Sequence, residues 1–197
     1  DDENYYTTDA FTDKAIEYID KVKSENNEKP FFLYLSYNAP HWPLQAPKED
    51  IDKYRGSYLK GWENLREERY KRMIEMGLID SSWDLSYDDI VSWKSLSKEK
   101  RKEMDLRMAI YAAMIDRMDQ NIGRLINDLK SKGLYDNTII MFLNDNGACA
   151  ENQMLGSGPK EQLETKEGYL LSYGKAWANA SNTTYRSYKH WHHEGGI

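Results

Sequence analysis

The stretch NTIIMFLNDNGA, residues 137–148, decides the expected fold. Residues 137–143 form a short, mostly apolar and β-branched run, which predicts a buried β-strand. The run leads directly into the polar sequence NDNG, residues 144–147, which is typical of a strand-ending turn. A similar run, FFLYLSY at 31–37, leads into the proline-rich loop NAPHWPLQAP at 38–47. Runs of this kind are typical of a parallel sheet that is covered on both faces.

Helices are expected before each of these strands. Residues 9–25 carry one apolar face, with Thr8 or Asp9 as a candidate cap. Residues 105–130 carry a longer face with steps of four and three, and Gly133 is a plausible end signal. The faces consist of Phe11, Ala15, Ile16, Ile19 and Val22 in the first helix, and of Tyr111, Ile115, Met118, Ile122, Leu125 and Leu129 in the second. The alternation predicts an α/β fold with a mostly parallel sheet flanked by helices.

Two segments do not fit this alternation. Residues 48–104 mix charges and tryptophans with weak periodicity, which favours a variable helical insertion within the domain. Residues 148–187 have no clear period and are expected to form a long loop.

Composition excludes several classes of function. The 197 residues carry a net charge of −6, so a broad nucleic-acid-binding face is not expected. No run of about 18 apolar residues is present, so no membrane span is predicted. The acidic first residues also argue against a signal peptide. The single cysteine, Cys149, cannot form an internal disulfide, and an inert buried thiol is the simpler interpretation.

Candidate site residues follow both predicted strands. Asp145 and Asn146 are hard oxygen donors that suit Ca²⁺ or Mg²⁺, although a plain turn would use the same residues. His41, between two prolines, suits an anion, although it can equally be a surface histidine. Lys189 is either a point charge for a sulfate or phosphate oxygen or an ordinary solvated lysine. Because ligands collect at the carboxyl ends of parallel strands, we expect these four side chains within a few Å of one another.

The C-terminal histidines do not predict zinc. The spacing of His190, His192 and His193 matches neither HExxH nor a zinc finger, and no cysteine is nearby in the sequence. Their roles stay open.

In combination, the motifs resemble the sulfatase family of the alkaline-phosphatase-like superfamily. The resemblance rests on PFFLYLSYNAPHWP (30–43), TIIMFLNDNGA (138–148) and TTYRSYKHWHHEGGI (183–197), in this order around a long helix. YYTTDAFTDKAIEYI (5–19) is similar to the stretch before the histidine loop of sulfatases, and WANASNTTYRSYK (177–189) is similar to bacterial arylsulfatases. The resemblance to the family covers nearly all of the chain and is weakest over residues 48–104.

The resemblance implies roles for the candidate residues. His41 matches the histidine that contacts the substrate's sulfate, and Lys189 matches the lysine that binds sulfate during catalysis. Asp145 and Asn146 match two ligands of the active-site Ca²⁺. The expected function is hydrolysis of sulfate esters, in a periplasmic or secreted enzyme acting on a sulfated small molecule or glycan.

Two parts of the family pattern are missing from these residues. The Cys/Ser-x-Pro/Ala-x-Arg motif that yields the formylglycine nucleophile is absent, and so are the paired aspartates that complete the metal site. The sequence therefore resembles the middle of a sulfatase catalytic domain, expected to be inactive and to bind Ca²⁺ weakly or not at all on its own. The alternatives are a phosphodiester or phosphonate hydrolase of the same superfamily and a non-catalytic domain that binds polyanions.

Overall fold

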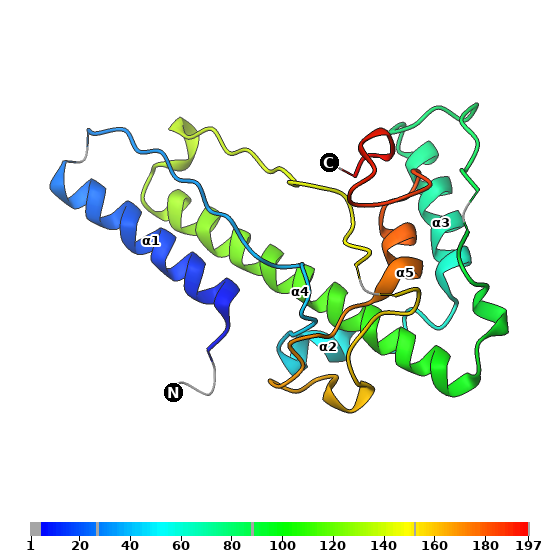
Figure 1. The fold of residues 1–197 in the computed structure, drawn as a ribbon. Coiled ribbons are helices and arrows are strands. Elements are labelled where there is room, and N and C mark those ends of the chain that lie inside the picture. Colours follow the sequence, from blue (N-terminus) through cyan, green and yellow to red (C-terminus); the bar gives the residue numbers. More distant parts are fainter. Residues whose placement is uncertain (1–4, 27, 88, 152, 197) are drawn as a thin grey trace.

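The computed structural model describes residues 5–26, 28–87, 89–151 and 153–196 (Figure 1). Over these residues the secondary structure is helical. The α-helices are α1 (Thr7–Glu25), α2 (Lys48–Tyr54), α3 (Trp62–Glu75), α4 (Lys98–Ser131) and α5 (Gly174–Ser181), and the 3₁₀ turns are η1 (Trp93–Ser95), η2 (Tyr135–Asn137), η3 (Lys160–Gln162) and η4 (His192–Glu194).

The long helix α4 organises the molecule, with α1 and α2 packed against it and α3 packed on α5 (Figure 1). Ion pairs join α1 to α4 and to Lys132, the residue that follows α4. The acidic partners on α1 and their basic partners advance together along the chain, so the two helices run parallel. These pairs are Asp9–Arg117, Asp13–Arg124 and Asp20–Lys132.

Helix α1 confirms the predicted helix but begins at Thr7. Its N-cap is Tyr6, without a side-chain cap, so the prediction of a cap at Thr8 or Asp9 was wrong. Thr8 is buried instead, and Asp9 lies in the first turn, where its charge is favourable near the helix N-terminus. The buried face is also rotated from the predicted one, because Phe11 is 37% exposed.

Helix α4 is longer than the periodicity predicted. It begins after Ser97, whose Oγ accepts a hydrogen bond from the Lys100 backbone N–H at 3.1 Å, a side-chain N-cap. It ends at Ser131, and Gly133 follows with φ +66, as expected for a glycine after a helix.

The core contains a cluster of three tryptophans from distant parts of the chain. The ring of Trp62 lies 4.8 Å from Trp93 and 5.3 Å from Trp177, centroid to centroid. Trp177 is fully buried, and its Nε1 donates a hydrogen bond of 2.9 Å to the Met104 carbonyl. Residues 48–104 contain α2, α3, η1 and the first turns of α4, and they supply two of the three tryptophans in this core.

The prediction of a continuous loop over 148–187 was wrong, because α5 lies within it. This helix has only eight residues, too few for a period to stand out, and it is held by burial of Trp177 and the alanines around it.

The predicted sheet is not confirmed. Residues 31–37 are extended, and so are residues 138–143, which follow the η2 turn. No backbone hydrogen bond joins the two segments, and no strand occurs among the residues described. Phe32 and Ile139 are 93% and 91% exposed. Segment 31–37 alternates between half-buried and exposed residues, and its inner side contacts α1 through a 2.7 Å hydrogen bond between Tyr37 and Thr12.

No described helix is long and apolar enough to cross a membrane.

Candidate functional site

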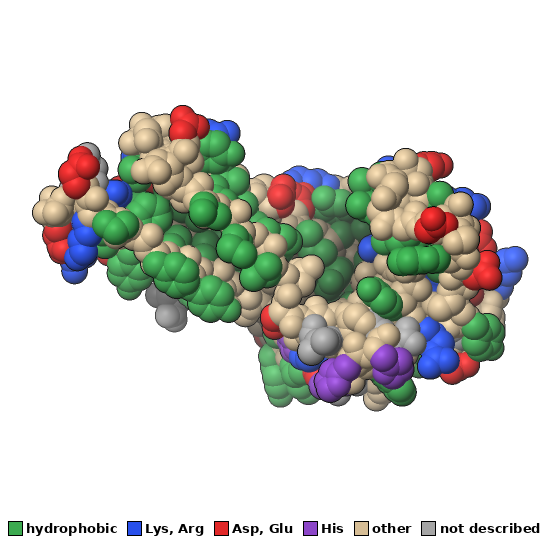
Figure 2. All heavy atoms as spheres, turned by 90° about the horizontal axis from the view of Figure 1, so that it is seen from above, with side chains coloured by type: hydrophobic (Ala, Val, Ile, Leu, Met, Phe, Trp, Pro, Cys, Tyr) green, Lys and Arg blue, Asp and Glu red, His purple; other side chains and the backbone are tan. Residues whose placement is uncertain are grey.

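The Glu151 carboxylate is the meeting point of three chain segments. Trp42 Nε1 donates a hydrogen bond of 3.1 Å to Oε2 of Glu151. His190 Nε2 lies 3.3 Å from Oε1, and Lys189 Nζ lies 3.8 Å from the same oxygen. We call these four residues, together with His41 and Cys149, the Glu151 site. Figure 2 shows histidine side chains gathered at one edge of the molecule.

Backbone contacts bring two of these segments together. The Lys189 backbone N–H donates a 3.0 Å hydrogen bond to the Ala148 carbonyl, which joins the loop after 137–143 to the C-terminal segment. Gly147 permits this approach, because a Cβ there would lie 2.6 Å from the Gly195 carbonyl oxygen.

His41 is held by its neighbour Trp42. Its Nδ1 lies 2.8 Å from the Trp42 carbonyl, which can only accept, so Nδ1 donates this hydrogen bond and Nε2 is the ring nitrogen left for another partner. Ligand atoms of His41, Cys149 and Glu151 all lie within 4.8 Å of one another. The site therefore combines hydrogen-bond donors with three potential metal ligands.

The surroundings shift two pKa values in the site. The hydrogen bond from Trp42, then the one from His190 and the charges of Lys189 and His41, hold the pKa of Glu151 below its usual value. Burial raises the pKa of the Cys149 thiol above its usual value. At neutral pH, Glu151 is thus an anion and Cys149 a protonated thiol.

The structure brings His41 and Lys189 to the same carboxylate, although 148 residues separate them in the chain. Asp145 is exposed, and Asn146 Nδ2 donates a 2.9 Å hydrogen bond to the Gly147 carbonyl, which leaves Oδ1 of Asn146 available. No hydrogen bond or ion pair joins Asp145 or Asn146 to His41 or Lys189 in the described part of the chain, so the expected proximity of all four stays a prediction.

Sequence reasoning missed Glu151. It carries no motif of its own, and its partners lie 109 and 39 residues away in the chain. Its position shortly after the NDNG turn was the one available signal.

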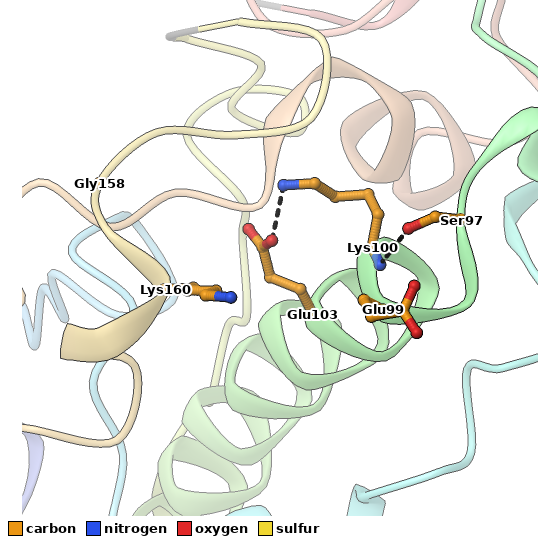
Figure 3. A pocket seen from close by; sticks show the side chains of 6 residues that line it. All are labelled: Ser97, Glu99, Lys100, Glu103, Gly158 and Lys160. Carbon is orange, nitrogen blue, oxygen red and sulfur yellow. Dashed lines mark hydrogen bonds and ion pairs between the residues drawn. The ribbon is translucent and has the colours of Figure 1, made fainter.

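A separate pocket of about 420 Å³ lies at the start of α4 and holds none of these residues (Figure 3). Lys100 and Glu103 pair with each other along α4 at 2.6 Å, and Lys160 lines the pocket from another segment. Glu103 also pairs with Arg107, so this carboxylate is neutralised by two cations.

Comparison with known proteins matches the chain to one family. The family model described as Sulfatase covers residues 1–195. An uncharacterized sulfatase of Schizosaccharomyces pombe is 37% identical, over 98% of this chain and 37% of its own length. An arylsulfatase of Klebsiella aerogenes is 34% identical, over 99% of this chain and 44% of its own length. An N-acetylglucosamine-6-O-sulfatase of Bacteroides thetaiotaomicron is 26% identical, over 74% of this chain and 34% of its own length. The chain thus spans less than half the length of these relatives.

Proposed function

Because the chain belongs to the sulfatase family, we propose that the protein containing it hydrolyses sulfate esters, with His41 and Lys189 binding the sulfate group. The convergence of Lys189, His41, His190 and Trp42 around one carboxylate carries this proposal. Donors that surround a carboxylate also suit the oxygens of a sulfate.

The chemistry of sulfate transfer assigns a role to each donor. The Lys189 ammonium neutralises negative charge on a sulfate oxygen, and this matters most as charge develops in the transition state. His41 contacts the sulfate through its ring and is kept in one orientation by the Trp42 carbonyl at 2.8 Å. Trp42 lies in the same loop and holds Glu151, so this loop orders the Glu151 site.

The sulfatase family is generally calcium-dependent. We assign Asp145 and Asn146 as two of the calcium ligands in this protein. The free Asn146 Oδ1 and the exposed Asp145 carboxylate are hard oxygen donors, which fit this ion. Calcium takes about 6–8 oxygen ligands, so these two residues form only part of its site. When bound, the ion supplies positive charge beside the sulfate oxygens.

The nucleophile, an expected formylglycine, belongs to sequence that these 197 residues do not contain. The substrate class we propose is a sulfated small molecule or glycan, as the names of the Klebsiella and Bacteroides relatives suggest. A periplasmic or secreted location would match such substrates.

Lys189→Ala in the full-length protein tests the proposal. We expect kcat/KM for an aryl sulfate to fall about 100-fold or more, because a charged group facing the transition state is lost. Lys160→Ala, at the separate pocket, is the matched control and should leave kcat/KM unchanged.

Two results would contradict the proposal. Equal activity of the Lys189 and Lys160 variants would remove Lys189 from the sulfate site. Faster hydrolysis of an aryl phosphate than of the aryl sulfate by the wild-type protein would identify a phosphoester hydrolase instead.

A further inference from the structure

We infer that His41, Cys149 and Glu151 form a binding site for a transition-metal ion of the zinc type, separate from the proposed calcium ligands Asp145 and Asn146. The three residues come from two loops that are more than 100 residues apart in sequence. Each offers one ligand atom, and the three atoms lie within 4.8 Å of one another.

The donor set selects the metal. One thiol, one imidazole and one carboxylate are the side chains that bind Zn²⁺. Calcium and magnesium prefer sites made wholly of oxygen, so this cluster disfavours both. The C-terminal histidines alone predicted no zinc, because their spacing matches no zinc motif and no cysteine is nearby in the sequence. It is the fold that brings Cys149 close to a histidine.

The geometry requires only a small adjustment. With metal–ligand distances of about 2.0–2.3 Å, tetrahedral coordination places ligand atoms about 3.3–3.8 Å apart. The ligand atoms now lie within 4.8 Å of one another, so the longest separation has to shorten by about 1–1.5 Å. His41 is exposed and Glu151 is partly exposed, so rotation of these two side chains can supply this movement.

Trp42 already supplies the outer contacts that such a site needs. A metal-bound histidine usually donates its other ring N–H to a carbonyl or carboxylate, and His41 Nδ1 does so to the Trp42 carbonyl at 2.8 Å. The Trp42 indole holds Oε2 of Glu151 at 3.1 Å, which leaves Oε1 for a metal. One residue thus orients two of the three ligands.

A fourth ligand is within reach. His190 Nε2 lies 3.3 Å from Oε1 of Glu151 and can rotate toward the metal, or water can fill that position. The Lys189 ammonium, 3.8 Å from Oε1, opposes the charge of the metal and keeps the affinity below that of a closed structural zinc site.

Binding is tested with Co²⁺ as a spectroscopic substitute for Zn²⁺. The purified protein, saturated with Ca²⁺, should develop a cobalt–thiolate charge-transfer band that Zn²⁺ then abolishes by displacement. Cys149→Ser should lack the band, and Glu151→Gln should weaken the affinity by about tenfold or more. His192→Ala is the matched control, since His192 is exposed and outside the cluster, and should bind as the wild type does.

Three results would contradict the proposed metal site. No band in wild-type protein, or a band that persists in Cys149→Ser, overturns the inference. Equal loss of affinity in His41→Ala and His192→Ala would do the same. Circular dichroism establishes that each variant is folded, and Trp42→Phe gives an independent test, because it should weaken metal binding about 10-fold without removing a ligand.

A consequence for activity rests on the proposed function. A metal bound to His41 prevents that side chain from contacting the sulfate, so Zn²⁺ should inhibit hydrolysis of an aryl sulfate. In Cys149→Ser the inhibition should be weaker, when the rate with Zn²⁺ is compared with the rate of the same variant without Zn²⁺. Cobalt binding without inhibition would contradict the role of His41 in sulfate binding and leave the metal site standing. Inhibition that is unchanged in Cys149→Ser would place the inhibitory metal elsewhere.

Discussion

At the scale of single residues, Glu151 decides the electrostatics of the candidate site. A carboxylate beside Lys189 lowers the positive potential that an incoming sulfate would encounter. The donors of Trp42 and His190 hold Glu151 there, and its lowered pKa keeps it charged near neutral pH.

Glu151→Gln should therefore lower the KM for an aryl sulfate. Glutamine has almost the same shape and can still accept from Trp42, but it carries no charge to compete with the sulfate for Lys189. Steady-state kinetics of the full-length protein at neutral pH measures the effect, which we expect to be severalfold, comparable with one exposed charge pair of about 1 kcal/mol. A higher KM would show instead that Glu151 positions Lys189.

The same residue shows where sequence reasoning stops. His41 and Lys189 became candidates because each lies in a motif that resembles the family pattern, and their roles in sulfate binding stay predictions. Glu151 and Cys149 could be recognised as site residues only from contacts between loops, and no local sequence pattern encodes a contact between residues 109 positions apart.

At the scale of elements, the pairing of α1 with α4 depends on a bidentate contact. Arg117 Nε and Nη2 donate hydrogen bonds of 2.8 and 2.6 Å to the two oxygens of Asp9, and Asn121 donates a third at 2.6 Å. Burial alone would raise the pKa of Asp9, but the hydrogen bonds from Arg117 and Asn121 outweigh it, and the pKa is lowered.

Asp9→Asn should destabilise the chain by about 1–2 kcal/mol at pH 7. Because the folded-state pKa of Asp9 lies below its unfolded value of about 3.9, its contribution is complete above that pH and is lost as pH falls through the folded-state pKa. Urea unfolding at pH 7 and at successively lower pH should show the difference shrinking only below about pH 4. Asp119→Asn, an exposed change on α4, is the control. An equal loss in both variants, or a difference that does not depend on pH, would contradict this role.

The helices and the strands were predictable to different degrees. Periodicity located α1 and α4, because a helix forms its hydrogen bonds within its own residues. The apolar runs at 31–37 and 137–143 predicted buried strands of a parallel sheet, but a strand needs a partner, and the pattern of one run does not specify what pairs with it. The buried face of α1 also differed from the prediction, since Thr8 and Thr12 are buried while Phe11 is partly exposed.

At the scale of the whole molecule, the apolar surface is unevenly distributed. Hydrophobic side chains gather over the part of the molecule that holds α1 and the C-terminal half of α4 (Figure 2). The exposed residues on the two extended segments include Phe32, Tyr34, Ile139, Met141, Phe142 and Leu143. Contiguous apolar surface of this kind is uncommon on a soluble monomer and favours association.

The chain of residues 1–197 should therefore bind the apolar dye Nile red. The double variant Ile139→Thr/Phe142→Thr should reduce the fluorescence and shift the free energy of unfolding by less than about 0.5 kcal/mol, because both side chains are exposed. Leu78→Thr, exposed on another part of the chain, should leave dye binding unchanged. Fluorescence that is unaffected by the double variant would place the dye elsewhere.

The parallel pairing of α1 with α4 also has a consequence for folding during synthesis. Arg117 follows Asp9 by 108 residues, and ribosomes add about 5–20 residues per second. Helix α1 is therefore synthesised roughly 5–20 s before the side chains that neutralise its acidic residues. During that interval its buried face, including Ala15 and Ile19, lacks its partner helix, so a chaperone that recognises amphipathic helices would find a binding surface on α1.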